Sequence, residues 1–365
     1  MGERQAAAGP GSAGAGGSPH PADPWLHPIG SALRAEPGYR TPLVASSRRG
    51  GELAWKYEGA SLTGTFKDRV MAELVAKAVA DGAPGAIVPS SGNAAAAAAA
   101  ACARAKLPLL ALVPATTSAA KLAPLRARGV PVVGVTGDPS SAYAAADALS
   151  RTHGLAELAS TFRSPGTELA CRRIGHEIVE QLGRPPAAVA AAISVGPVLL
   201  GTARGVREAS GHSPRMLAGQ AAGCAPIAAA FRAGHDAVEP WGGPIETAAH
   251  SIADRLTGYA HEGAFMARQV RASGGTVQAW DDDALISARR DVVAGEGLDV
   301  ELASAAGVCA AITWEGTGPV VGVLTGAGWR ETVAEAETLR PTSVESFARR
   351  IDAPDLVEDL HQWTT

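Results

Sequence analysis

The sequence predicts an α/β protein in which parallel β-sheets are covered by helices. Short apolar segments alternate with helical segments along the first half of the chain. A strand followed by a helix and a second strand favours parallel pairing of the two strands. With 365 residues, the chain can form one large domain or two of ordinary size. We therefore expect two parallel-sheet α/β domains, with a cleft between them beyond the carboxyl ends of the strands.

The alternation can be followed element by element. Each expected strand is a short run of apolar or alternating residues. The expected strands cover residues 52–58, 86–89, 109–113, 130–135, 188–195, 216–220, 275–280 and 320–324. The helices expected between the first of these strands cover residues 93–106, 121–128 and 140–151.

The expected domains follow from this order of elements. The larger α/β domain combines residues 21–65 and 166–350, and the smaller α/β domain covers residues 66–165. Residues 1–20 are rich in Gly, Ala, Ser and Pro and have almost nothing to bury, so we expect a disordered tail. Residues 351–365 are expected to form a C-terminal tail.

The composition narrows the function. A hydrophobic fraction of 46%, a charged fraction of 19% and a net charge of −4 are typical of a soluble globular protein. Without a basic patch interleaved with aromatic residues, nucleic acid is not expected as a partner. The longest apolar run, residues 94–103, is too short to span a membrane, and the N-terminus does not resemble a signal peptide. We expect a cytoplasmic protein that contacts no membrane.

Four cysteines are widely spaced along the chain. Cys102, Cys171, Cys224 and Cys309 form no CxxC pair. This spacing argues against a zinc site and against a disulfide framework, so no metal is expected. Free cysteines also fit a reducing compartment.

A candidate reactive lysine stands at the start of an expected helix. Lys67 follows a Thr-Gly-Thr turn, in which Gly64 loosens the backbone and Thr65 can cap the helix. An amine held near a helix N-terminus and away from water loses its proton more easily. A lysine that attacks a carbonyl carbon needs this property. An ordinary solvated lysine is the alternative, and such lysines are common.

The residues around this lysine resemble a known signature. Residues 61–69 have the sequence SLTGTFKDR, similar to the Pro-Thr-Gly-Ser-Phe-Lys-Asp-Arg of fold-type II pyridoxal-phosphate enzymes, and most similar to the threonine synthase branch. The resemblance continues in order over roughly residues 38–330. It implies the tryptophan synthase β-like fold, pyridoxal 5'-phosphate as cofactor, a small-molecule amino acid substrate and a homodimer. It also implies that Lys67 is catalytic and binds the cofactor.

A second motif implies contacts to the cofactor and the substrate. Residues 90–93 have the sequence SSGN and follow an expected strand. Taken alone, this is a turn and a helix cap. In the family, however, the asparagine binds the ring hydroxyl of the cofactor and the Ser-Gly turn faces the substrate carboxylate. The resemblance thus implies the first role for Asn93 and the second for Ser90, Ser91 and Gly92.

A third motif implies the partner of the pyridine nitrogen. Residues 322–328 have the sequence GVLTGAG, which resembles the Leu-Thr-Gly-His-Gly of the family and has Ala327 in place of histidine. By this resemblance, the hydroxyl of Thr325 meets the pyridine nitrogen. A hydroxyl does not hold that nitrogen protonated, and the weaker electron sink fits elimination and replacement chemistry. Taken alone, the segment is a strand that ends in a glycine turn.

A fourth motif lies between these segments. Residues 295–306 have the sequence GEGLDVELASAA, which resembles the Glu-Gly-Ile-x-x-Glu-Pro-x-Ser-Ala-Ala of the family and has Leu302 at the proline. By this resemblance, Glu296 lines the cofactor; a solvated glutamate is the alternative. Ser304 is expected to cap the helix that follows.

The segment expected to hold the cofactor phosphate departs from the family. The family uses a run of glycines, which lets the backbone amides approach the phosphate. Here residues 194–205 read SVGPVLLGTARG, with only Gly196 before a proline that lacks an N–H. The amides of Val198 and Leu199, or the hydroxyl of Thr202, are the expected substitutes.

The substrate side departs as well. Threonine synthases grip the substrate phosphate with an Asn-Ser pair followed by an arginine. By register, the matching residues here are Thr161, Phe162 and Thr167, within the sequence TFRSPGT. Arg163 is the candidate substrate-binding residue from a shifted position, because a guanidinium binds phosphate well. A surface arginine is the alternative.

Three hypotheses follow. The first is a pyridoxal-phosphate-dependent elimination or replacement on an amino acid, such as the conversion of O-phosphohomoserine to threonine. The second is a diverged β/γ-replacement enzyme or a dehydratase that acts on another amino acid. The third is a cofactor-free binding or regulatory homologue, which the short glycine loop favours. The joint presence of Lys67, Asn93 and Thr325 argues against this third hypothesis.

Overall fold

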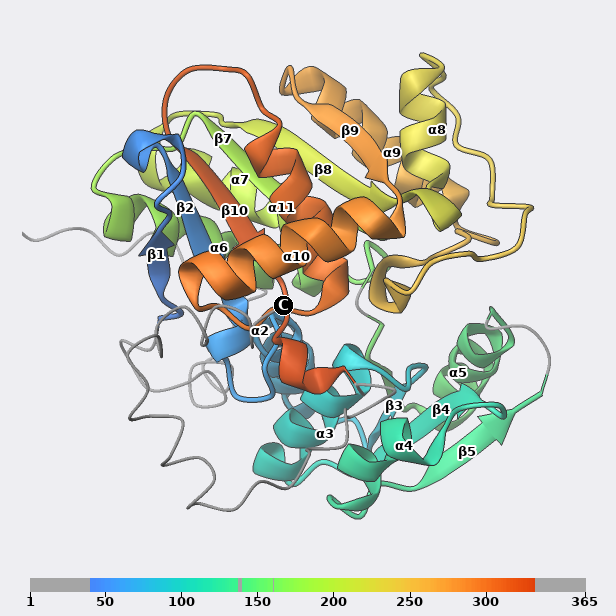
Figure 1. Cartoon of the computed structure of the whole chain (residues 1–365). Coiled ribbons are helices and arrows are strands. Elements are labelled where there is room, and N and C mark those ends of the chain that lie inside the picture. Colours follow the sequence, from blue (N-terminus) through green and yellow to red (C-terminus); the bar gives the residue numbers. More distant parts are fainter. Residues whose placement is uncertain (1–39, 137–139, 160, 332–365) are drawn as a thin grey trace, which may run out of the picture. The chain divides into compact units, whose positions relative to one another are not determined.

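The computed structural model describes residues 40–136, 140–159 and 161–331, and the described residues up to Arg330 belong to one compact unit (Figure 1). The tails expected at residues 1–20 and 351–365 lie outside the described residues. The division into a larger and a smaller domain stays a prediction.

The larger sheet has six strands in the order β1-β2-β10-β7-β8-β9. The strands are β1 (Leu43–Ala45), β2 (Leu53–Tyr57), β7 (Ala188–Ala192), β8 (Arg215–Ala221), β9 (Thr276–Trp280) and β10 (Val320–Leu324). Five of the strands are parallel, whereas β1 pairs with β2 in the antiparallel direction. Strand β1 therefore adds one antiparallel edge to a sheet that is otherwise parallel, as expected. The connection from β1 to β2 is too short for the crossover that parallel strands need.

Helices cover both faces of the larger sheet (Figure 1). On strand β7, Val189 and Ala191 join one hydrophobic cluster, and Ala188, Ala190 and Ala192 join the other. This alternation arises because successive side chains of a strand point to opposite faces. The first cluster includes α6 (Pro165–Leu182), α7 (Pro197–Ser210), α8 (Pro226–Arg232) and α9 (Ala260–Ala272); the second includes α10 (Asp282–Glu296) and α11 (Ala305–Ile312).

The smaller sheet has four parallel strands in the order β5-β4-β3-β6. They are β3 (Ala86–Val88), β4 (Leu109–Pro114), β5 (Val132–Val135) and β6 (Ala156–Glu157), and the helices beside them are α2 (Lys67–Ala80), α3 (Asn93–Ala105), α4 (Ala119–Arg126) and α5 (Ser140–His153). Ile87 and Leu112 pack on α5, whereas Ala86, Val88 and Ala111 belong to the cluster that holds α2 and α3.

The expected strands and helices are confirmed, with ends that differ by a few residues. Strands β1 and β6 were not expected, because three and two residues are too few to form an apolar pattern. Short 3₁₀ helices complete the described chain: η1 (Arg49–Gly51), η2 (Glu58–Ala60), η3 (Ala222–Cys224), η4 (His250–Ile252), η5 (Leu302–Ser304) and η6 (Gly328–Arg330).

A network of buried charges anchors the first turn of α2. Arg69 pairs with Glu58 (Nε–Oε2, 2.7 Å) and with Glu177 (Nη1–Oε1, 2.7 Å). Glu177 also pairs with the fully buried Lys56 (Nζ–Oε2, 2.7 Å). Buried charges are tolerated when each has an opposite partner and further hydrogen bonds. Because Arg69 lies two residues after Lys67, the network holds the start of this helix in place.

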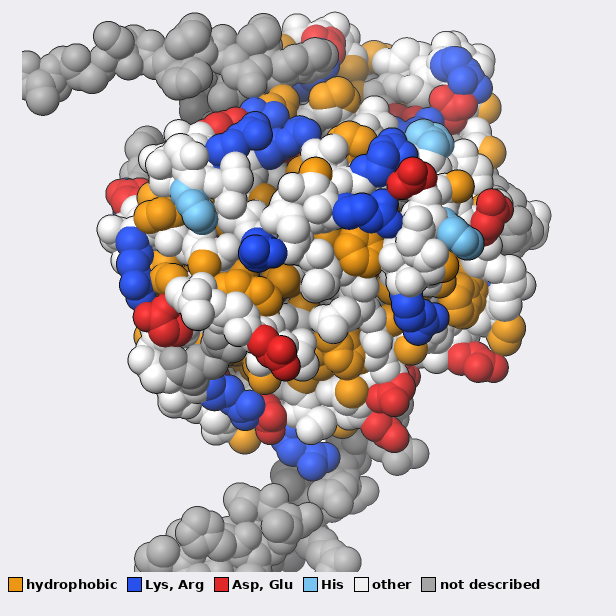
Figure 2. Space-filling model, turned by 90° about the horizontal axis from the view of Figure 1, so that it is seen from above, with side chains coloured by type: hydrophobic (Ala, Val, Ile, Leu, Met, Phe, Trp, Pro, Cys, Tyr) orange, Lys and Arg blue, Asp and Glu red, His pale blue; other side chains and the backbone are white. Residues whose placement is uncertain are grey.

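The face of the molecule in Figure 2 carries charges of both signs. Basic and acidic side chains are interspersed there with hydrophobic ones. Such a face does not present the one-sign field that attracts nucleic acid.

Candidate active site

Lys67 is the first residue of α2, directly after a hydrogen-bonded turn. Gly64 has a φ of 78°, in the left-handed region that favours glycine. The carboxylate of Asp68 accepts hydrogen bonds from the amide of Thr63 (2.7 Å) and from its hydroxyl (2.8 Å). The hydroxyl of Thr65 donates to the backbone oxygen of Thr325 (3.1 Å) and accepts a long bond from the amide of Lys67 (3.4 Å). Thr65 therefore supports the helix start weakly and connects the turn to another strand.

The lysine turn is fixed to the end of strand β10. The amide of Phe66 donates to the backbone oxygen of Thr325 (3.0 Å), and the amide of Ala327 donates to that of Gly64 (2.8 Å). Strands β2 and β10 are parallel neighbours, so their carboxyl ends meet at the same edge of the sheet. Lys67 and Thr325 are thereby brought together from distant parts of the sequence.

The surroundings of Lys67 make its amine easier to deprotonate. Burial lowers the pKa of Lys67 to about 8, against the opposing effects of Cys171, Glu301 and Asp254. Its Nζ lies 4.5 Å from the centroid of the Phe66 ring. At a pKa near 8, roughly a tenth of the amine is uncharged at pH 7. The structure thus supports the reactive lysine inferred from the sequence.

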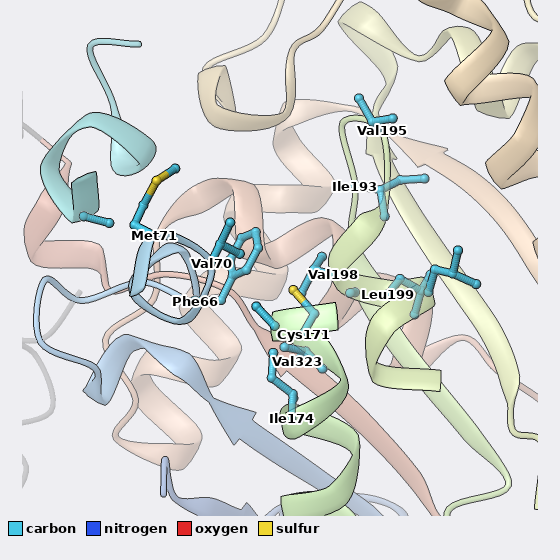
Figure 3. Packing of buried hydrophobic residues seen from close by; sticks show 14 of the residues in the cluster. Phe66, Val70, Met71, Cys171, Ile174, Ile193, Val195, Val198, Leu199 and Val323 are labelled. Carbon is cyan, nitrogen blue, oxygen red and sulfur yellow. The ribbon is translucent and has the colours of Figure 1, made fainter. Parts of the chain in front are cut away.

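Apolar side chains pack together at the start of α2. Figure 3 shows Phe66, which precedes α2, and Val70 of α2 beside Cys171 of α6 and Val198 of α7. Burial raises the pKa of Cys171 to about 12, so its thiol stays protonated at neutral pH. An apolar environment disfavours the charged form of an amine, which explains the lowered pKa of Lys67.

A buried carboxylate connects the two side chains expected at the cofactor ring. Glu301 accepts a hydrogen bond from Asn93 (Nδ2–Oε2, 2.9 Å) and one from Thr325 (Oγ1–Oε1, 3.3 Å). Glu301 is only 5% exposed. Asn93 starts α3 beside the smaller sheet, and Thr325 follows strand β10 of the larger one. Glu301 therefore fixes these two residues relative to each other.

Sequence reasoning missed Glu301. The signal was present, because Glu301 matches the second glutamate of the family motif that residues 295–306 resemble. Glu296, which was considered instead, ends α10 and accepts a hydrogen bond from the hydroxyl of Ser46 (2.5 Å). That contact places the side chain of Glu296 away from the Asn93–Glu301–Thr325 contacts.

The role expected for Ser304 is wrong. In the described structure, its side chain does not cap α11. Its Oγ accepts hydrogen bonds from the amides of Thr325 (3.0 Å) and Gly326 (3.2 Å) and lies 2.9 Å from the Oγ1 of Thr325. A hydroxyl has two acceptor lone pairs and one proton. Since both lone pairs are used, the proton of Ser304 points to the Oγ1 of Thr325, and the proton of Thr325 is donated to Glu301.

The expected phosphate end of the site lies at the start of α7. Gly196 has a φ of 117°, and a Cβ there would approach the Cγ of Met266 to 2.7 Å. The first turn of a helix leaves its amides without helical acceptors, and Val198 and Leu199 lie in this turn. The hydroxyl of the buried Thr202 already donates to the backbone oxygen of Val198 (2.8 Å).

The residues expected at the substrate lie in two different settings. Ser90 accepts a hydrogen bond from the amide of Gly92 (Oγ–N, 3.2 Å), in the partly exposed turn that leads to Asn93. Arg163 instead pairs with Glu157 (Nη2–Oε2, 3.3 Å) and Asp147 (Nη2–Oδ1, 3.6 Å). Chain connectivity places the Ser-Gly turn beside Asn93, whereas the contacts of Arg163 are with carboxylates.

The described residues offer neither a metal site nor a membrane-spanning helix. Within residues 40–136, 140–159 and 161–331, no three His, Cys, Asp or Glu side chains gather in a way that could hold a metal ion. In the same described part, no helix is long and apolar enough to cross a membrane.

The groups at this site fit pyridoxal phosphate. Lys67 supplies an amine that is partly uncharged at neutral pH, and Thr325 supplies a buried hydroxyl at the end of β10. Gly196 keeps the start of α7 free of a side chain that would collide with Met266. A parallel-sheet α/β fold with a lysine at this helix start defines the class of fold-type II pyridoxal-phosphate enzymes.

Comparison with known proteins gives the family. Residues 35–326 match the family model described as "Pyridoxal-phosphate dependent enzyme". The chain belongs to this family and is a pyridoxal-phosphate-dependent lyase.

Relatives and solved structures agree with this family. The threonine synthase of Methanosarcina acetivorans is 31% identical over 281 residues, which is 74% of this chain and 67% of that protein. The threonine synthase of Synechocystis sp. is 32% identical over 309 residues, or 80% of this chain and 77% of that protein. The structure of maize serine racemase is similar with a TM-score of 0.69 and 19% identity, covering 90% of this chain and 94% of that one. At such low identity, this last likeness concerns the fold.

Proposed function

We propose that this protein catalyses elimination or replacement on an amino acid substrate, as the threonine synthases do. One observation supports this most directly: the Thr325 hydroxyl, held between Ser304 and Glu301, lies on the strand end to which the Lys67 turn is bonded. A hydroxyl adds no charge at the ring nitrogen, which suits elimination and replacement better than chemistry that needs a strong electron sink.

Each part of the cofactor would be bound by a different set of residues. Lys67 would hold the cofactor covalently and then, as the free amine, move the proton at the Cα of the substrate. Asn93 would bind the ring hydroxyl and Thr325 the ring nitrogen. The amides of Gly196, Val198 and Leu199 would bind the phosphate at the start of α7. When bound, the cofactor supplies an electron sink for the negative charge that develops at Cα.

The substrate would lie on the Ser90–Gly92 side of Asn93. Amides and hydroxyls in a strand-to-helix turn can donate to a carboxylate. Glu301 would keep Asn93 and Thr325 at a fixed spacing, because it bonds to both. Two reactions fit this arrangement. The first is the conversion of O-phosphohomoserine to threonine, and the second is a replacement or dehydration of another amino acid.

The visible absorption spectrum tests the cofactor and its lysine. We expect purified protein with added pyridoxal phosphate to show the band of a lysine-linked cofactor, and Lys67→Ala to lack it. Lys77→Ala is the matched control, because Lys77 lies in the same helix and forms an exposed ion pair with Asp81. A band retained in Lys67→Ala, or absent from wild type with excess cofactor, would contradict the proposal.

The proposed assembly rests on the resemblance to the family alone. We propose a cytoplasmic homodimer, with a larger domain of residues 21–65 and 166–350 and a smaller domain of residues 66–165. Sedimentation at micromolar concentration should show a dimer. A monomer under these conditions would contradict the assembly and leave the chemistry of the site unaffected.

A further inference from the structure

We propose that a cavity between α6, α7 and α9 binds a small carboxylate with an apolar body. The cavity has a volume of about 490 Å³. Cavities of about 300–1,000 Å³ are typical of sites for small molecules. The proposal concerns a second site, outside the cofactor site, and does not depend on the proposed function.

Helix α6 separates the cavity from the reactive lysine. Glu168, Leu169 and Arg172 line the cavity, and their spacing places them on one face of α6. Cys171 and Ile174 are fully buried and pack in the core with side chains from the start of α2 (Figure 3). Since Lys67 begins α2, the cavity and the lysine lie on different sides of α6.

Two glycines of α7 bring the polar wall of the cavity together. A Cβ at Gly201 would lie 2.5 Å from the backbone oxygen of Glu168, and one at Gly205 would collide with the backbone oxygen of Arg172. Only glycine allows the two helices to approach this closely. Arg204, between these glycines, thereby reaches the same cavity as Glu168 and Arg172.

The polar wall contains one carboxylate and two guanidinium groups. Glu168 is buried and accepts hydrogen bonds from Arg172 (Nε–Oε1 and Nη2–Oε2, both 2.9 Å) and from Arg204 (Nη1–Oε2, 3.0 Å). Arg172 also donates to Glu208 (Nη1–Oε1, 2.7 Å), so each of its guanidinium nitrogens is engaged. By contrast, the Nε and Nη2 of Arg204 have no hydrogen-bond partner among the residues that the structure describes.

These contacts favour an anionic ligand over a cationic one. A guanidinium presents its donors in a planar fork that matches a carboxylate. The charged side chains that line the cavity are Arg172, Arg204 and Glu168, so positive charges outnumber negative ones there. Both oxygens of Glu168 are already bonded to arginines, so an ammonium group would meet two guanidinium groups and no unengaged carboxylate oxygen. A carboxylate can bind to the fork of Arg204.

The rest of the cavity wall is apolar. Phe162 and Phe265 pack edge to face, with ring centroids 5.2 Å apart. Pro165, Leu169 and Leu200 complete this part of the wall. These side chains offer no polar group to a ligand, so they favour the burial of a hydrocarbon part. The cavity therefore suits a ligand that has a carboxylate at one end and an apolar body at the other.

Four small molecules test the two requirements separately. Phenylacetate carries both parts, phenylacetamide lacks the charge, acetate lacks the ring, and L-phenylalanine adds an ammonium group. Fluorine NMR of para-fluorophenylacetate measures binding to the full-length protein incubated with pyridoxal phosphate, and each of the four compounds is then added as a competitor. We expect phenylacetate to displace the fluorinated probe at concentrations at least ~10-fold lower than each of the other three.

Variants assign the binding to the cavity. Arg204→Gln should weaken the binding of para-fluorophenylacetate at least ~10-fold and change that of para-fluorophenylacetamide less than ~2-fold, because only the charged contact is lost. Arg207→Gln is the matched control, because Arg207 is exposed on the same helix. Leu169→Trp should fill the cavity and abolish the binding of both probes. Should Arg204→Gln not fold, the four compounds on wild type and Leu169→Trp still decide.

Several results would overturn the proposal. Equal displacement by phenylacetate and phenylacetamide would show that Arg204 binds no anion, and equal or better displacement by L-phenylalanine would contradict the choice of an anion without a positive group. Equal losses in Arg204→Gln and Arg207→Gln, or unchanged binding in Leu169→Trp, would place the ligand elsewhere.

The absence of binding at millimolar concentration would show that another part of the chain or a second copy covers the cavity, and would also overturn the proposal. The fluorine signal does not depend on the visible band of the cofactor. Failure of this proposal is therefore distinguishable from failure of the proposed function.

Discussion

The two ends of the candidate cofactor site are built in different ways. At the ring end, Glu301 and Ser304 hold Asn93 and Thr325 by side-chain hydrogen bonds. At the phosphate end, the start of α7 offers backbone amides, and Gly196 is packed against Met266. Side-chain hydrogen bonds depend on residue identity, whereas backbone amides are present in any residue but proline. The glycine run can therefore shorten at the phosphate end while the ring end keeps its residue types.

The largest effect should come from adding a side chain at the phosphate end. Gly196→Ala combines an unfavourable φ of 117° with the approach to Met266. Backbone strain and overpacking together should lower the free energy of unfolding by about 4 kcal/mol. Denaturant unfolding measures this loss of stability. Titration with the cofactor measures the effect of the same change on cofactor binding.

A matched glycine isolates the steric part of this effect. Gly183 also has a positive φ, of 71°, but a Cβ there meets nothing within 4 Å. Gly183→Ala should cost only about 1 kcal/mol and leave cofactor binding unchanged. Equal losses of unfolding free energy in Gly196→Ala and Gly183→Ala would show that the contact with Met266 contributes nothing.

The next effect concerns the charge of Lys67 in the cofactor-free protein. Burial lowers its pKa to about 8, so the folded protein releases this proton before the unfolded chain does. Between pH 8 and the pKa that Lys67 has in the unfolded chain, the unfolded state binds more protons than the folded state. The contribution of Lys67 to the free energy of unfolding therefore rises with pH over this range, by up to about 3 kcal/mol. Below pH 8, this unfavourable contribution is complete and constant.

The pH dependence of unfolding measures this directly. The difference in unfolding free energy between wild type and Lys67→Met should change between pH 8 and pH 10 and stay flat below pH 8. Cofactor incorporation should become faster over the same rise through pH 8, because only the uncharged amine reacts. A flat difference across the whole range would mean that Lys67 is solvated.

A smaller effect should come from Ser304. Ser304→Ala removes the acceptor of the Thr325 and Gly326 amides and the donor to the Thr325 hydroxyl. Buried groups left without partners should lower the free energy of unfolding by about 2 kcal/mol. The visible band of the holoenzyme should also shift, because the Thr325 hydroxyl loses one of the two side-chain contacts that orient it. Destabilisation with an unchanged band would make Ser304 purely structural.

The smallest effect is expected at Thr202. Its hydroxyl donates to the backbone oxygen of Val198 within α7. Thr202→Val keeps the shape and should cost about 1 kcal/mol or less of stability. Cofactor affinity, measured by titration of the visible band, should change less than ~2-fold. A large loss of affinity would restore Thr202 as a phosphate ligand.

Much of the ring end was predictable from sequence, because its residues sit in motifs with a local structure. The expected helix starts at Lys67 and Asn93 and the strand before Thr325 are confirmed. Each depends on local patterns, such as a turn before a helix or a short apolar run. Their roles toward the cofactor stay predictions.

The connections between these motifs were not predictable. Glu301 meets Asn93 across 208 residues of sequence, and local patterns carry no information about such contacts. Serine is a residue type that often caps helices, but the hydroxyl of Ser304 instead accepts hydrogen bonds from the two amides at the end of β10.

The central claim is that Lys67 holds the cofactor, and the fully buried Lys56 provides a strict test. Burial also lowers the pKa of Lys56, which pairs with Glu177. Borohydride reduction of the holoenzyme, followed by digestion and mass spectrometry, identifies the lysine that carries the cofactor. We expect the added mass on the peptide that contains Lys67. Its presence on Lys56 or another lysine, or its absence from every peptide, would contradict the account.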